Sequence, residues 1–474
     1  MGPLRIQNWS MGRLVREMEG RLVSPTIEVE PITGVSTDTR TIDEGALFVA
    51  LRGERFDGHN FIHEAIDAGA RAVVVDDRSA VETERIPAIV VDDCIAALGR
   101  LGNAVFEAAR HDGMHSIAVT GSNGKTTTKE FLAALWGTQG SVWATPGNLN
   151  NHIGVPLTLC AIPADCDHLI VEMGANHRGE IETLIELAPA DQRIVTSIGR
   201  AHLGGFGSMS GVRKAKSEIF NNPMRITDAI VPFDERRALV GDEFRGNVWT
   251  FGDDSGADVS VQSIDIVDDS SGGVAMDVSL QLWEATRTIR LPVVGRHNAT
   301  NLAAALATFA HRRSLVESCD FDDALAGVEL PAGRFRIETI GPFKVMDDAY
   351  NANPSSMRAS FRAFEQWCQN IDIGPRVAVI GDMLELGDAA EQSHRALAQW
   401  LADRPRLSAI AFVGQFAGQM VDAVSDSAIA DVVALDDHDD AAQWLVDHGT
   451  ACVFLKGSRG NRLEAVVDAL KTKL

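Results

Sequence analysis

Residues 115–136 read HSIAVTGSNGKTTTKEFLAALW, and this stretch decides the fold of the middle of the chain. An apolar, β-rich run at 115–120 leads into a glycine-rich turn, and an amphipathic helical pattern follows from residue 127. A glycine-rich turn at the start of a helix directs backbone N–H groups and the positive end of the helix dipole toward phosphate oxygens. We therefore predict a strand, a phosphate-binding loop and a helix, in this order.

The loop carries the groups that nucleotide binding requires. Lys125 provides a positive charge for phosphate, and Thr126 provides a hydroxyl suited to Mg²⁺. Val119 stands where the general phosphate-loop pattern has its first glycine. The pattern predicts a nucleoside triphosphate site, but it leaves kinase, GTPase, helicase and ligase activities open. The predicted ATP-binding residues of the loop are Gly121, Ser122, Asn123, Gly124, Lys125, Thr126 and Thr127.

Composition limits the class of function. The 474 residues are 45% hydrophobic and 23% charged, which is typical of a folded globular protein of two or three domains. Nucleic acid and anionic membranes both bind proteins through Lys and Arg contacts with phosphate. The net charge of −23 therefore disfavours both as partners.

The chain also lacks signals for export. Its first residues, MGPLRIQNWSMGRLVREM, contain no continuous apolar core of the signal-peptide kind, and no stretch approaches the roughly 18 apolar residues of a spanning helix. The six cysteines form no CxxC pair, which favours buried thiols in a reducing compartment over a disulfide or zinc framework. We expect a cytoplasmic protein that does not insert into a membrane.

The segments on either side continue the α/β pattern. Upstream, β-like runs occur at 46–51, 72–75 and 88–91, with a helical pattern at 61–68. Downstream, HLIVEMG and RIVTSIG are apolar strands that end in small or polar residues, where a parallel sheet places its ligand-binding loops. Alternating patterns between residues 253 and 292 predict antiparallel strands.

The last third of the chain continues the α/β pattern, with apolar strands predicted in RVAVIGD, SAIAFVG and ACVFLKGS. We therefore predict an α/β protein with a small N-terminal α/β domain, a central phosphate-loop domain with an antiparallel appendage, and a doubly wound, Rossmann-like C-terminal domain. The predicted boundaries are 1–112, 113–330 and 331–474.

Three further positions are suggested by residue type and spacing. Glu172 ends a predicted strand beside the phosphate loop, where a carboxylate can hold Mg²⁺; the alternative is a solvated strand end. Asn298 and Asn301 are spaced i, i+3 at the start of an alanine-rich helix, so both amides can face one ligand, such as an adenine edge. An ordinary helix cap is the alternative for this pair.

Ten segments, in chain order, resemble the motif series of the Mur ligases. They are TGSNGKTTTKE, TPGNLNNHIGVPLT, VEMGANHRGEI, IGRAHLGGFGS, VRKAKSEIF, GRHNATNLAAALA, GRFRIE, DDAYNANPSSM, GDMLELGD and LKGSRGNRLE. The series extends over nearly the whole chain, and an ordered series is far more specific than the phosphate loop alone.

The resemblance implies ATP and two Mg²⁺ ions as cofactors. It makes Glu172 a ligand of one ion, and it makes His202 and a carbamylated Lys216 ligands of the second. Lys214 is the alternative position for the modified lysine, and the KxxIF spacing favours Lys216. This chain departs from the family near His202, where Gly204 replaces a glutamate and Ser197 an asparagine.

The resemblance also implies substrate-binding residues. Arg334 and Asp348 would close over the phosphates and ribose of ATP, and Asn298 and Asn301 would contact its adenine. The uridine diphosphate of the precursor would bind a polar cluster near the N-terminus: Ser36, Thr37, Asp38 and Arg40. An asparagine-rich loop would contact phosphate or substrate, with an ordinary loop as the alternative: Asn148, Asn150 and Asn151.

The implied reaction is ATP-dependent addition of D-alanyl-D-alanine to UDP-N-acetylmuramoyl-tripeptide, through an acyl phosphate, in peptidoglycan biosynthesis. Lys125, His202 and Lys216 would be catalytic, and we expect the protein to act as a monomer. A related ligase that adds a single amino acid is the nearest alternative, but such enzymes carry a YAHNP-like segment where this chain has DDAYNANPSSM, and an Asn-Pro-Arg motif that is absent. A nucleotide-dependent switch is a second alternative, although it would not need a third domain.

Overall fold

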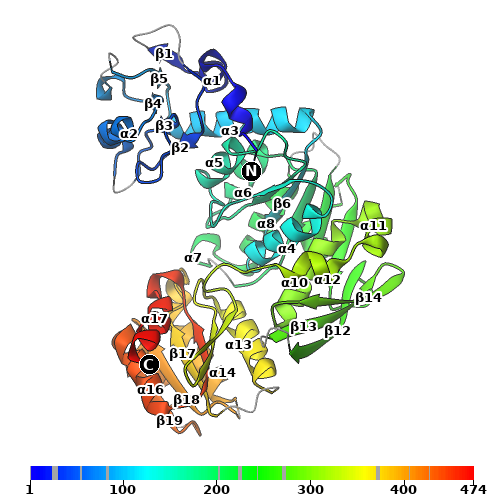
Figure 1. The fold of residues 1–474 in the computed structure, drawn as a ribbon. Coiled ribbons are helices and arrows are strands. Elements are labelled where there is room, and N and C mark those ends of the chain that lie inside the picture. The colour runs from blue at the N-terminus through cyan, green and yellow to red at the C-terminus, as the bar shows by residue number, and fades with distance from the viewer. Residues whose placement is uncertain are drawn as a thin grey trace.

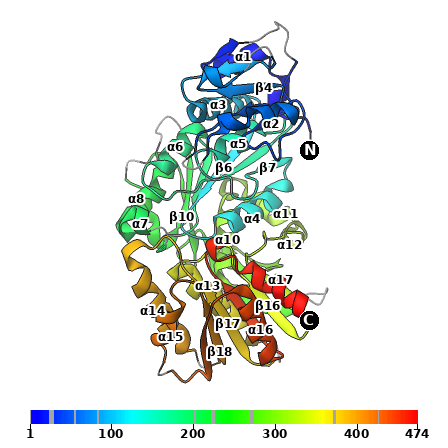
Figure 2. The same ribbon diagram turned by 90° about the vertical axis from the view of Figure 1, so that its left-hand side faces the viewer.

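The computed structural model describes residues 2–23, 30–53, 56–81, 85–200, 203–221, 227–242, 244–268, 274–369, 374–404, 406–425 and 427–474. Three α/β units lie in a row, with the N-terminal unit at the top and the C-terminal unit at the bottom of Figures 1 and 2. Each unit is built on its own sheet. The predicted fold class is therefore confirmed.

The N-terminal unit has a five-stranded sheet in the order β1-β5-β4-β3-β2. Strands β2 to β5 run parallel, and β1 is an antiparallel edge. Residues along β3 and β4 alternate between two apolar clusters, one on each face of the sheet. The predicted β-like runs at 46–51, 72–75 and 88–91 correspond to β3, β4 and β5. The elements are β1 (Arg21–Val23), β2 (Val35–Ser36), β3 (Leu47–Val49), β4 (Ala72–Val75), β5 (Ala88–Val90), α1 (Met11–Glu17), α2 (Ile62–Asp67) and α3 (Cys94–His111).

Helix α3 connects the first unit to the second. The Asp93 carboxylate accepts a hydrogen bond from the Ala96 N–H and so caps the helix start. Gly102 allows close approach to the next unit, because a Cβ there would lie 3.0 Å from Pro156 Cα. The apolar face of α3 packs in a cluster that contains residues of both units. The first two units therefore share a hydrophobic core.

The central unit has a nine-stranded sheet in the order β14-β13-β12-β11-β10-β9-β6-β8-β7. Strands β6 to β12 are parallel, and β12 to β14 form the predicted antiparallel appendage, which continues the same sheet. The predicted strand, phosphate-binding loop and helix at residues 115–136 form β6, the phosphate loop and α4. The elements are β6 (His115–Thr120), β7 (Val142–Ala144), β8 (His168–Glu172), β9 (Gln192–Val195), β10 (Asp228–Pro232), β11 (Val248–Gly252), β12 (Val259–Asp268), β13 (Val274–Leu282), β14 (Ala285–Leu291), α4 (Lys125–Gly137), α5 (Gly154–Cys160), α6 (Glu180–Leu187), α7 (Leu203–Phe206), α8 (Met209–Ser217), α9 (Arg236–Leu239), α10 (Arg296–Ala307), α11 (Arg313–Ser318) and α12 (Phe321–Ala326).

The C-terminal unit has a six-stranded sheet in the order β15-β16-β20-β17-β18-β19, parallel except for β15 at one edge. Alternate residues of β17 enter two different apolar clusters, so both faces of the sheet are covered. The elements are β15 (Arg336–Ile340), β16 (Phe343–Asp347), β17 (Arg376–Gly381), β18 (Ala409–Val413), β19 (Asp431–Leu435), β20 (Cys452–Lys456), α13 (Pro354–Gln369), α14 (Ala390–Ala402), α15 (Ala417–Asp422), α16 (His438–His448) and α17 (Glu464–Lys473).

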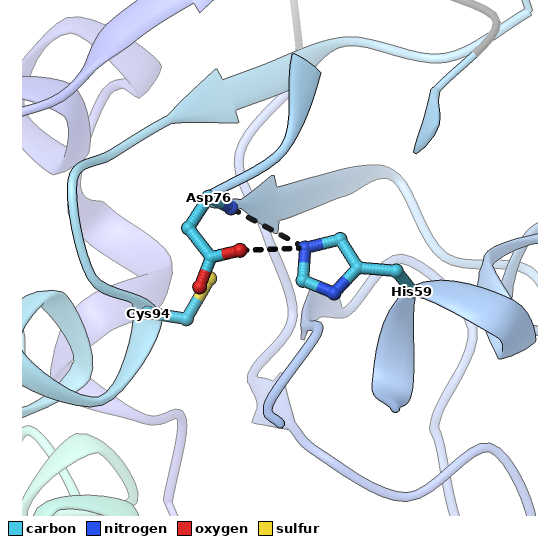
Figure 3. A group of neighbouring side chains, drawn as sticks. All are labelled: His59, Asp76 and Cys94. Atoms are coloured by element: carbon cyan, nitrogen blue, oxygen red, sulfur yellow. Dashed lines mark hydrogen bonds and ion pairs between the residues drawn. The ribbon is translucent and has the colours of Figure 1, made fainter. Parts of the chain in front are cut away.

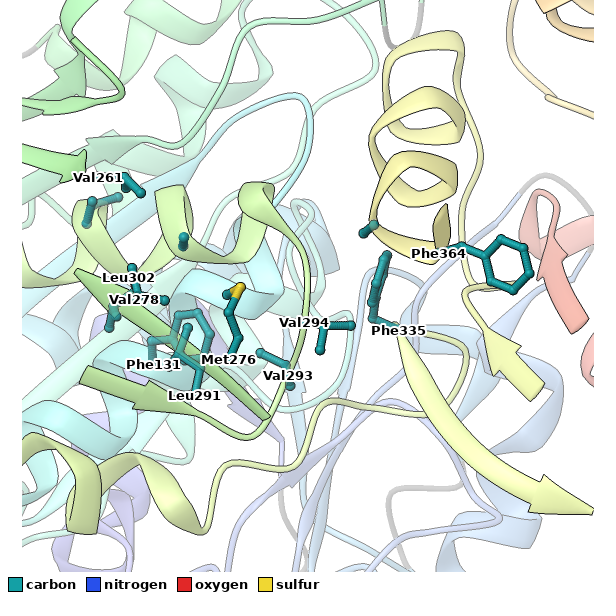
Figure 4. Packing of buried hydrophobic residues seen from close by; sticks show 14 of the residues in the cluster. Phe131, Val261, Met276, Val278, Leu291, Val293, Val294, Leu302, Phe335 and Phe364 are labelled. Carbon is teal, nitrogen blue, oxygen red and sulfur yellow. The ribbon is translucent and has the colours of Figure 1, made fainter. Parts of the chain in front are cut away.

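An apolar cluster connects the central and C-terminal units. Figure 4 shows Val293 and Val294 between Met276 of the central unit and Phe335, which precedes β15. This contact holds the C-terminal sheet with its strand ends facing the phosphate loop. Among the described residues, no helix is long and apolar enough to cross a membrane.

Candidate functional site

A cavity of about 620 Å³ lies between the central and C-terminal units. The phosphate loop and the ends of β8 and β9 line it on one side, and the segment after β16 lines it on the other. In both units these are the carboxyl ends of parallel strands, where α/β proteins bind ligands. Fourteen of the predicted site residues line the cavity: Ser122, Asn123, Gly124, Lys125, Thr126, Thr127, Asn148, Asn150, Asn151, Glu172, Asn298, Asn301, Arg334 and Asp348.

Two glycines give the phosphate loop its shape. Gly124 has φ +83°, and a Cβ at this position would lie 2.2 Å from Asn301 Oδ1. Gly121 has φ +150°, and a Cβ there would lie 2.0 Å from Thr196 Oγ1. Both positions combine unusual backbone angles with close neighbours, so only glycine fits. The loop can therefore turn sharply into α4.

The segment after β9 holds the loop in place. Asn123 donates its N–H to Ser197 Oγ at 3.0 Å, and its carbonyl accepts from Thr196 Oγ1 at 2.6 Å. Ser122 Oγ accepts from the Gly199 N–H at 2.9 Å. Ser197, which departs from the family pattern, thus has a clear local role as a partner of the phosphate loop.

Lys125 lies at the base of the cavity. Its ammonium donates to the Gly121 carbonyl at 2.9 Å and so folds back along the loop. Burial lowers the pKa of Lys125, whereas the carboxylates of Glu172 and Glu385 oppose this shift. The ammonium is thus placed beside the N–H groups that open α4.

Glu172 ends β8 and is 1% exposed. One carboxylate oxygen accepts from Thr126 Oγ1 at 2.8 Å, and the other accepts from Asn150 Nδ2 at 2.7 Å. A buried carboxylate beside a hydroxyl at a phosphate loop is a donor set that suits a hard cation such as Mg²⁺. These residues therefore fit a magnesium ion bound with a nucleotide.

Lys216 lies on α8 and does not line the cavity. It is 1% exposed, whereas Lys214 on the same helix is exposed. Burial, reinforced by the Lys125 ammonium, lowers the pKa of Lys216 to about 7. The predicted His202 lies outside the described residues.

Helix α10 presents the predicted asparagine pair. Asn298 and Asn301 are buried on one face, and the Asn301 amide donates to Asn298 Oδ1 at 3.4 Å. Asn298 also donates to the Val294 carbonyl at 2.8 Å. This second bond ties the first turn of α10 to the segment that precedes it, and Asn301 Oδ1 faces Gly124 of the phosphate loop.

The C-terminal wall centres on Asp348. Its carboxylate pairs with the Lys456 ammonium, and it accepts from Ser360 Oγ at 2.5 Å and from the Phe335 N–H at 3.2 Å. The Arg334 guanidinium lies 4.0 Å from the centre of the Tyr350 ring. These contacts hold Asp348 and Arg334 at the cavity wall.

Hydrogen bonds connect the two walls directly. Asn353 Nδ2 donates to Asn123 Oδ1 of the phosphate loop at 2.6 Å. Asn353 belongs to the DDAYNANPSSM segment, so this motif lies against the phosphate loop.

Sequence reasoning missed several lining residues: His297, Tyr350, Ser360, Glu385, Lys456 and Arg459. These residues could not be predicted because they lie far along the chain from the residues they contact. Lys456, for example, is 108 residues from Asp348. A weak signal existed for Lys456, because it is one of few lysines and follows an apolar strand. His297 is a different case: burial lowers its pKa to about 4, which keeps its ring neutral beside Phe335.

The predicted N-terminal cluster lies apart from this cavity, after β2. Ser36 Oγ accepts from the Asp38 N–H at 3.1 Å, and Arg40 pairs with the Asp38 carboxylate at 2.6 Å. The Arg40 side chain lowers the pKa of Asp38 to about 2. Thr37 completes this turn. Of the asparagine loop, Asn151 caps α5 by accepting from the Gly154 N–H at 2.8 Å.

A second polar cluster lies at the carboxyl edge of the N-terminal sheet. Figure 3 shows His59, Asp76 and Cys94, whose potential ligand atoms lie within 4.8 Å of one another. The His59 ring bridges Asp57, at 2.6 Å, and Asp76, at 3.3 Å, and Arg52 pairs with Asp76 at 3.1 Å. Because these side chains already pair with one another, we interpret the cluster as a clamp between the ends of β3 and β4.

Three family models match the chain. They are the Mur ligase middle domain at residues 119–309, the Mur ligase family catalytic domain at 31–112, and the Mur ligase glutamate ligase domain at 333–459. UDP-N-acetylmuramoyl-tripeptide--D-alanyl-D-alanine ligase of Bacillus subtilis (strain 168) is 36% identical over 379 residues, which cover 80% of this chain and 79% of that protein.

Solved structures are similar over nearly the whole length. MurF from Acinetobacter baumannii has a TM-score of 0.86 and 32% identity, covering 99% of this chain and 100% of that chain. MurF ligase from Thermotoga maritima, solved in complex with ADP, has a TM-score of 0.78 and 27% identity, covering 93% of this chain and 97% of that chain.

Proposed function

Because the chain belongs to the Mur ligase family of ATP-dependent ligases, we propose that it joins D-alanyl-D-alanine to UDP-N-acetylmuramoyl-tripeptide in peptidoglycan precursor synthesis. The observation that carries this proposal is the cavity in which the phosphate loop faces the DDAYNANPSSM segment. In the proposed reaction the γ-phosphoryl group of ATP passes to the terminal carboxylate of the tripeptide. The amine of the dipeptide then attacks the acyl phosphate, and phosphate leaves as the amide forms.

The phosphate end of the site must bring two anions together. The loop N–H groups and the Lys125 ammonium would bind the nucleotide phosphates and the charge that develops on the transferred group. Thr126 and Glu172 would hold the first Mg²⁺, which supplies charge neutralisation when bound. The remaining loop residues orient the backbone donors toward the same oxygens.

A second Mg²⁺ would be held by His202 and a carbamylated Lys216. Carbamylation joins a neutral amine to CO₂, and the low pKa of Lys216 leaves much of its amine neutral near pH 7. The carbamate is an anion, so it would attract a cation that an ammonium repels. The burial of Lys216 and the exposure of Lys214 favour Lys216 as the modified residue.

The nucleoside would lie between α10 and the C-terminal wall. Asn298 and Asn301 would face the adenine, with Asp348 at the ribose and Arg334 at the phosphates. The precursor would extend from the cavity toward the N-terminal unit, where Ser36, Thr37, Asp38 and Arg40 would bind its uridine diphosphate. Asn148, Asn150 and Asn151 would line its path. Closure of the walls would exclude water from the acyl phosphate.

We further propose that the protein acts as a cytoplasmic monomer, and that its domains divide near residues 112 and 330. The division is supported by the sheets, since β5 and β6 lie on either side of the first boundary and β14 and β15 on either side of the second.

A phosphate-release assay tests the substrate assignment. The purified protein, MgATP and UDP-N-acetylmuramoyl-tripeptide are combined with D-alanyl-D-alanine or with single amino acids. We expect release that requires both the tripeptide and the dipeptide. Equal release with a single amino acid would favour the alternative ligase, and release without any amine would favour a nucleotide-dependent switch.

A further inference from the structure

The chain has a single tyrosine, Tyr350, and this residue lines the cavity between the central and C-terminal units. The Arg334 guanidinium lies over its ring, 4.0 Å from the ring centre. The Arg459 guanidinium is farther away, at 5.8 Å, and pairs with Glu464 at 3.1 Å. Arg334 is therefore the closer cationic partner of the ring.

The backbone on both sides of Arg334 has an unusual conformation. Gly333 has φ +72°, and Phe335 has φ +55°, in the left-handed region that a bulky residue rarely adopts. The Gly333 carbonyl accepts from the Tyr350 N–H at 2.8 Å, and the Phe335 N–H donates to Asp348 Oδ1 at 3.2 Å. These two hydrogen bonds, one on each side of Arg334, fix its backbone against the segment that carries the tyrosine.

A buried lysine fixes that segment in turn. Lys456 is 2% exposed, and its ammonium donates to the carbonyls of Asp348, at 3.2 Å, and Asn351, at 2.9 Å. The two carbonyls lie on either side of Tyr350 in the chain. The backbone that carries the ring is therefore held at two points by one ammonium.

The ring restrains the Arg334 side chain without using its hydrogen-bond donors. Arginine has several rotatable bonds and loses rotamer entropy when it is ordered. The buried Nε of Arg334 has no hydrogen-bond partner within the described part of the chain. A guanidinium that lies over an aromatic ring keeps the N–H groups at its edge available for phosphate.

The geometry points to Tyr350 as a positioning residue that holds the Arg334 guanidinium toward the nucleotide phosphates. This inference rests on the proposed function, which places Arg334 at those phosphates. The ring takes no part in bond formation. It orders the arginine before the nucleotide binds, so less rotamer entropy is lost when guanidinium and phosphate meet.

A double-mutant cycle tests the coupling between the two side chains. Tyr350→Leu removes the ring, and we expect it to lower kcat/KM for ATP about 3- to 30-fold, the range that a cation–π contact supports. Tyr350→Phe keeps the ring and should recover most of this loss. In Arg334→Gln, the further change Tyr350→Leu should have little additional effect, because no guanidinium remains to be held.

Two comparisons make the cycle specific. Arg336→Gln removes an exposed charge two residues beyond Arg334, outside the cavity lining, and should match the wild type. The KM for D-alanyl-D-alanine should stay unchanged in Tyr350→Leu. Losses that multiply in the double variant, or a rise in the dipeptide KM with an unchanged kcat/KM for ATP, would overturn the positioning role.

Fluorine resonance tests the contact without any turnover. Because Tyr350 is the only tyrosine of the chain, protein made with 3-fluorotyrosine carries the ¹⁹F label at this one site. We expect Arg334→Gln to shift the ¹⁹F resonance in the absence of nucleotide, and Arg336→Gln to leave it in place. A resonance that does not move in Arg334→Gln overturns the inference, whatever the turnover assay shows.

The two readouts separate this inference from the proposed function. If the wild type shows no phosphate release that depends on tripeptide and dipeptide, the proposed function fails, and the role of the ring in that reaction fails with it. If the wild type is active but the substitutions at Tyr350 and Arg334 act independently, the proposed function stands and the positioning role alone is overturned.

Discussion

At the scale of single residues, the site depends on positions where only one side chain fits. The phosphate loop requires glycine where the backbone turns and where neighbouring side chains approach closely. It requires a lysine that donates to the Gly121 carbonyl, and a carboxylate whose two oxygens are fixed. These requirements explain why the loop could be recognised from sequence even though Val119 replaces the first glycine of the general pattern.

Gly124→Ala should abolish nucleotide binding. An alanine there is strained at φ +83°, and its Cβ would displace Asn301, 2.2 Å away. Calorimetric titration with MgATP should show at least a tenfold loss of affinity. Gly137→Ala is the matched control, because nothing lies within 4 Å of a Cβ there. Equal affinity in Gly124→Ala and wild type would contradict the loop geometry.

Lys216→Ala should lose most turnover, by about 10²-fold or more, because it removes the carbamate that would hold the second Mg²⁺. Short carboxylates such as acetate, added to this variant, should restore part of the rate, since they can replace the missing anion. Lys214→Ala is the control on the exposed side of the same helix and should keep its activity. Full activity of Lys216→Ala would disprove the carbamate role.

At the scale of elements, sequence patterns predicted strands that are long and apolar. HSIAVT, RVAVIGD and SAIAFVG are the strands β6, β17 and β18, because buried parallel strands need continuous apolar runs. Strands β2 and β7 were not predicted, since two or three residues carry no readable period. The C-terminal contacts of Asp348 could not be predicted, because its partners meet only when β16 and β20 pair.

Two histidines lie at the amino ends of the central strands, the end of the sheet away from the cavity. There they make the stability of the fold depend on pH. His115 opens β6 and His168 opens β8, and their rings lie 4.6 Å and 4.8 Å from the Trp136 ring. Burial lowers the pKa of His115 to about 4. His168 and Arg312 lower this pKa further, whereas the Asp191 carboxylate raises it. The folded protein therefore holds this ring neutral.

The sign of the pH effect follows from that shift. Between pH 6.5 and about 4 the unfolded chain binds a proton at His115 that the folded chain does not. Stability is thus present above pH 6.5 and is lost as the pH falls, by up to about 1.4 kcal/mol per pH unit. Thermal unfolding of His115→Phe should show a smaller pH dependence in this range. His111→Gln, an exposed control, should behave like the wild type, and an unchanged slope in His115→Phe would rule out this origin.

At the scale of the whole molecule, the central unit contacts both the N-terminal and the C-terminal unit. The N-terminal unit shares an apolar core with the central unit, which carries the phosphate loop. The C-terminal unit contacts the centre through the cluster around Val294 and Phe335, and through the bond from Asn353 to Asn123. The cavity is lined by the carboxyl ends of strands from the central and C-terminal sheets, which form the middle and the lower unit in Figure 2.

The central claim is that the cavity activates a carboxylate by phosphorylating it, and isotope transfer tests this most directly. UDP-N-acetylmuramoyl-tripeptide labelled with ¹⁸O in its terminal carboxylate is incubated with the protein, MgATP and D-alanyl-D-alanine, and the released phosphate is analysed by mass spectrometry. The account predicts one carboxylate-derived oxygen in each phosphate, and ¹⁸O in half of the phosphate if one of the two carboxylate oxygens is labelled. Phosphate without label, released as product forms, would contradict it.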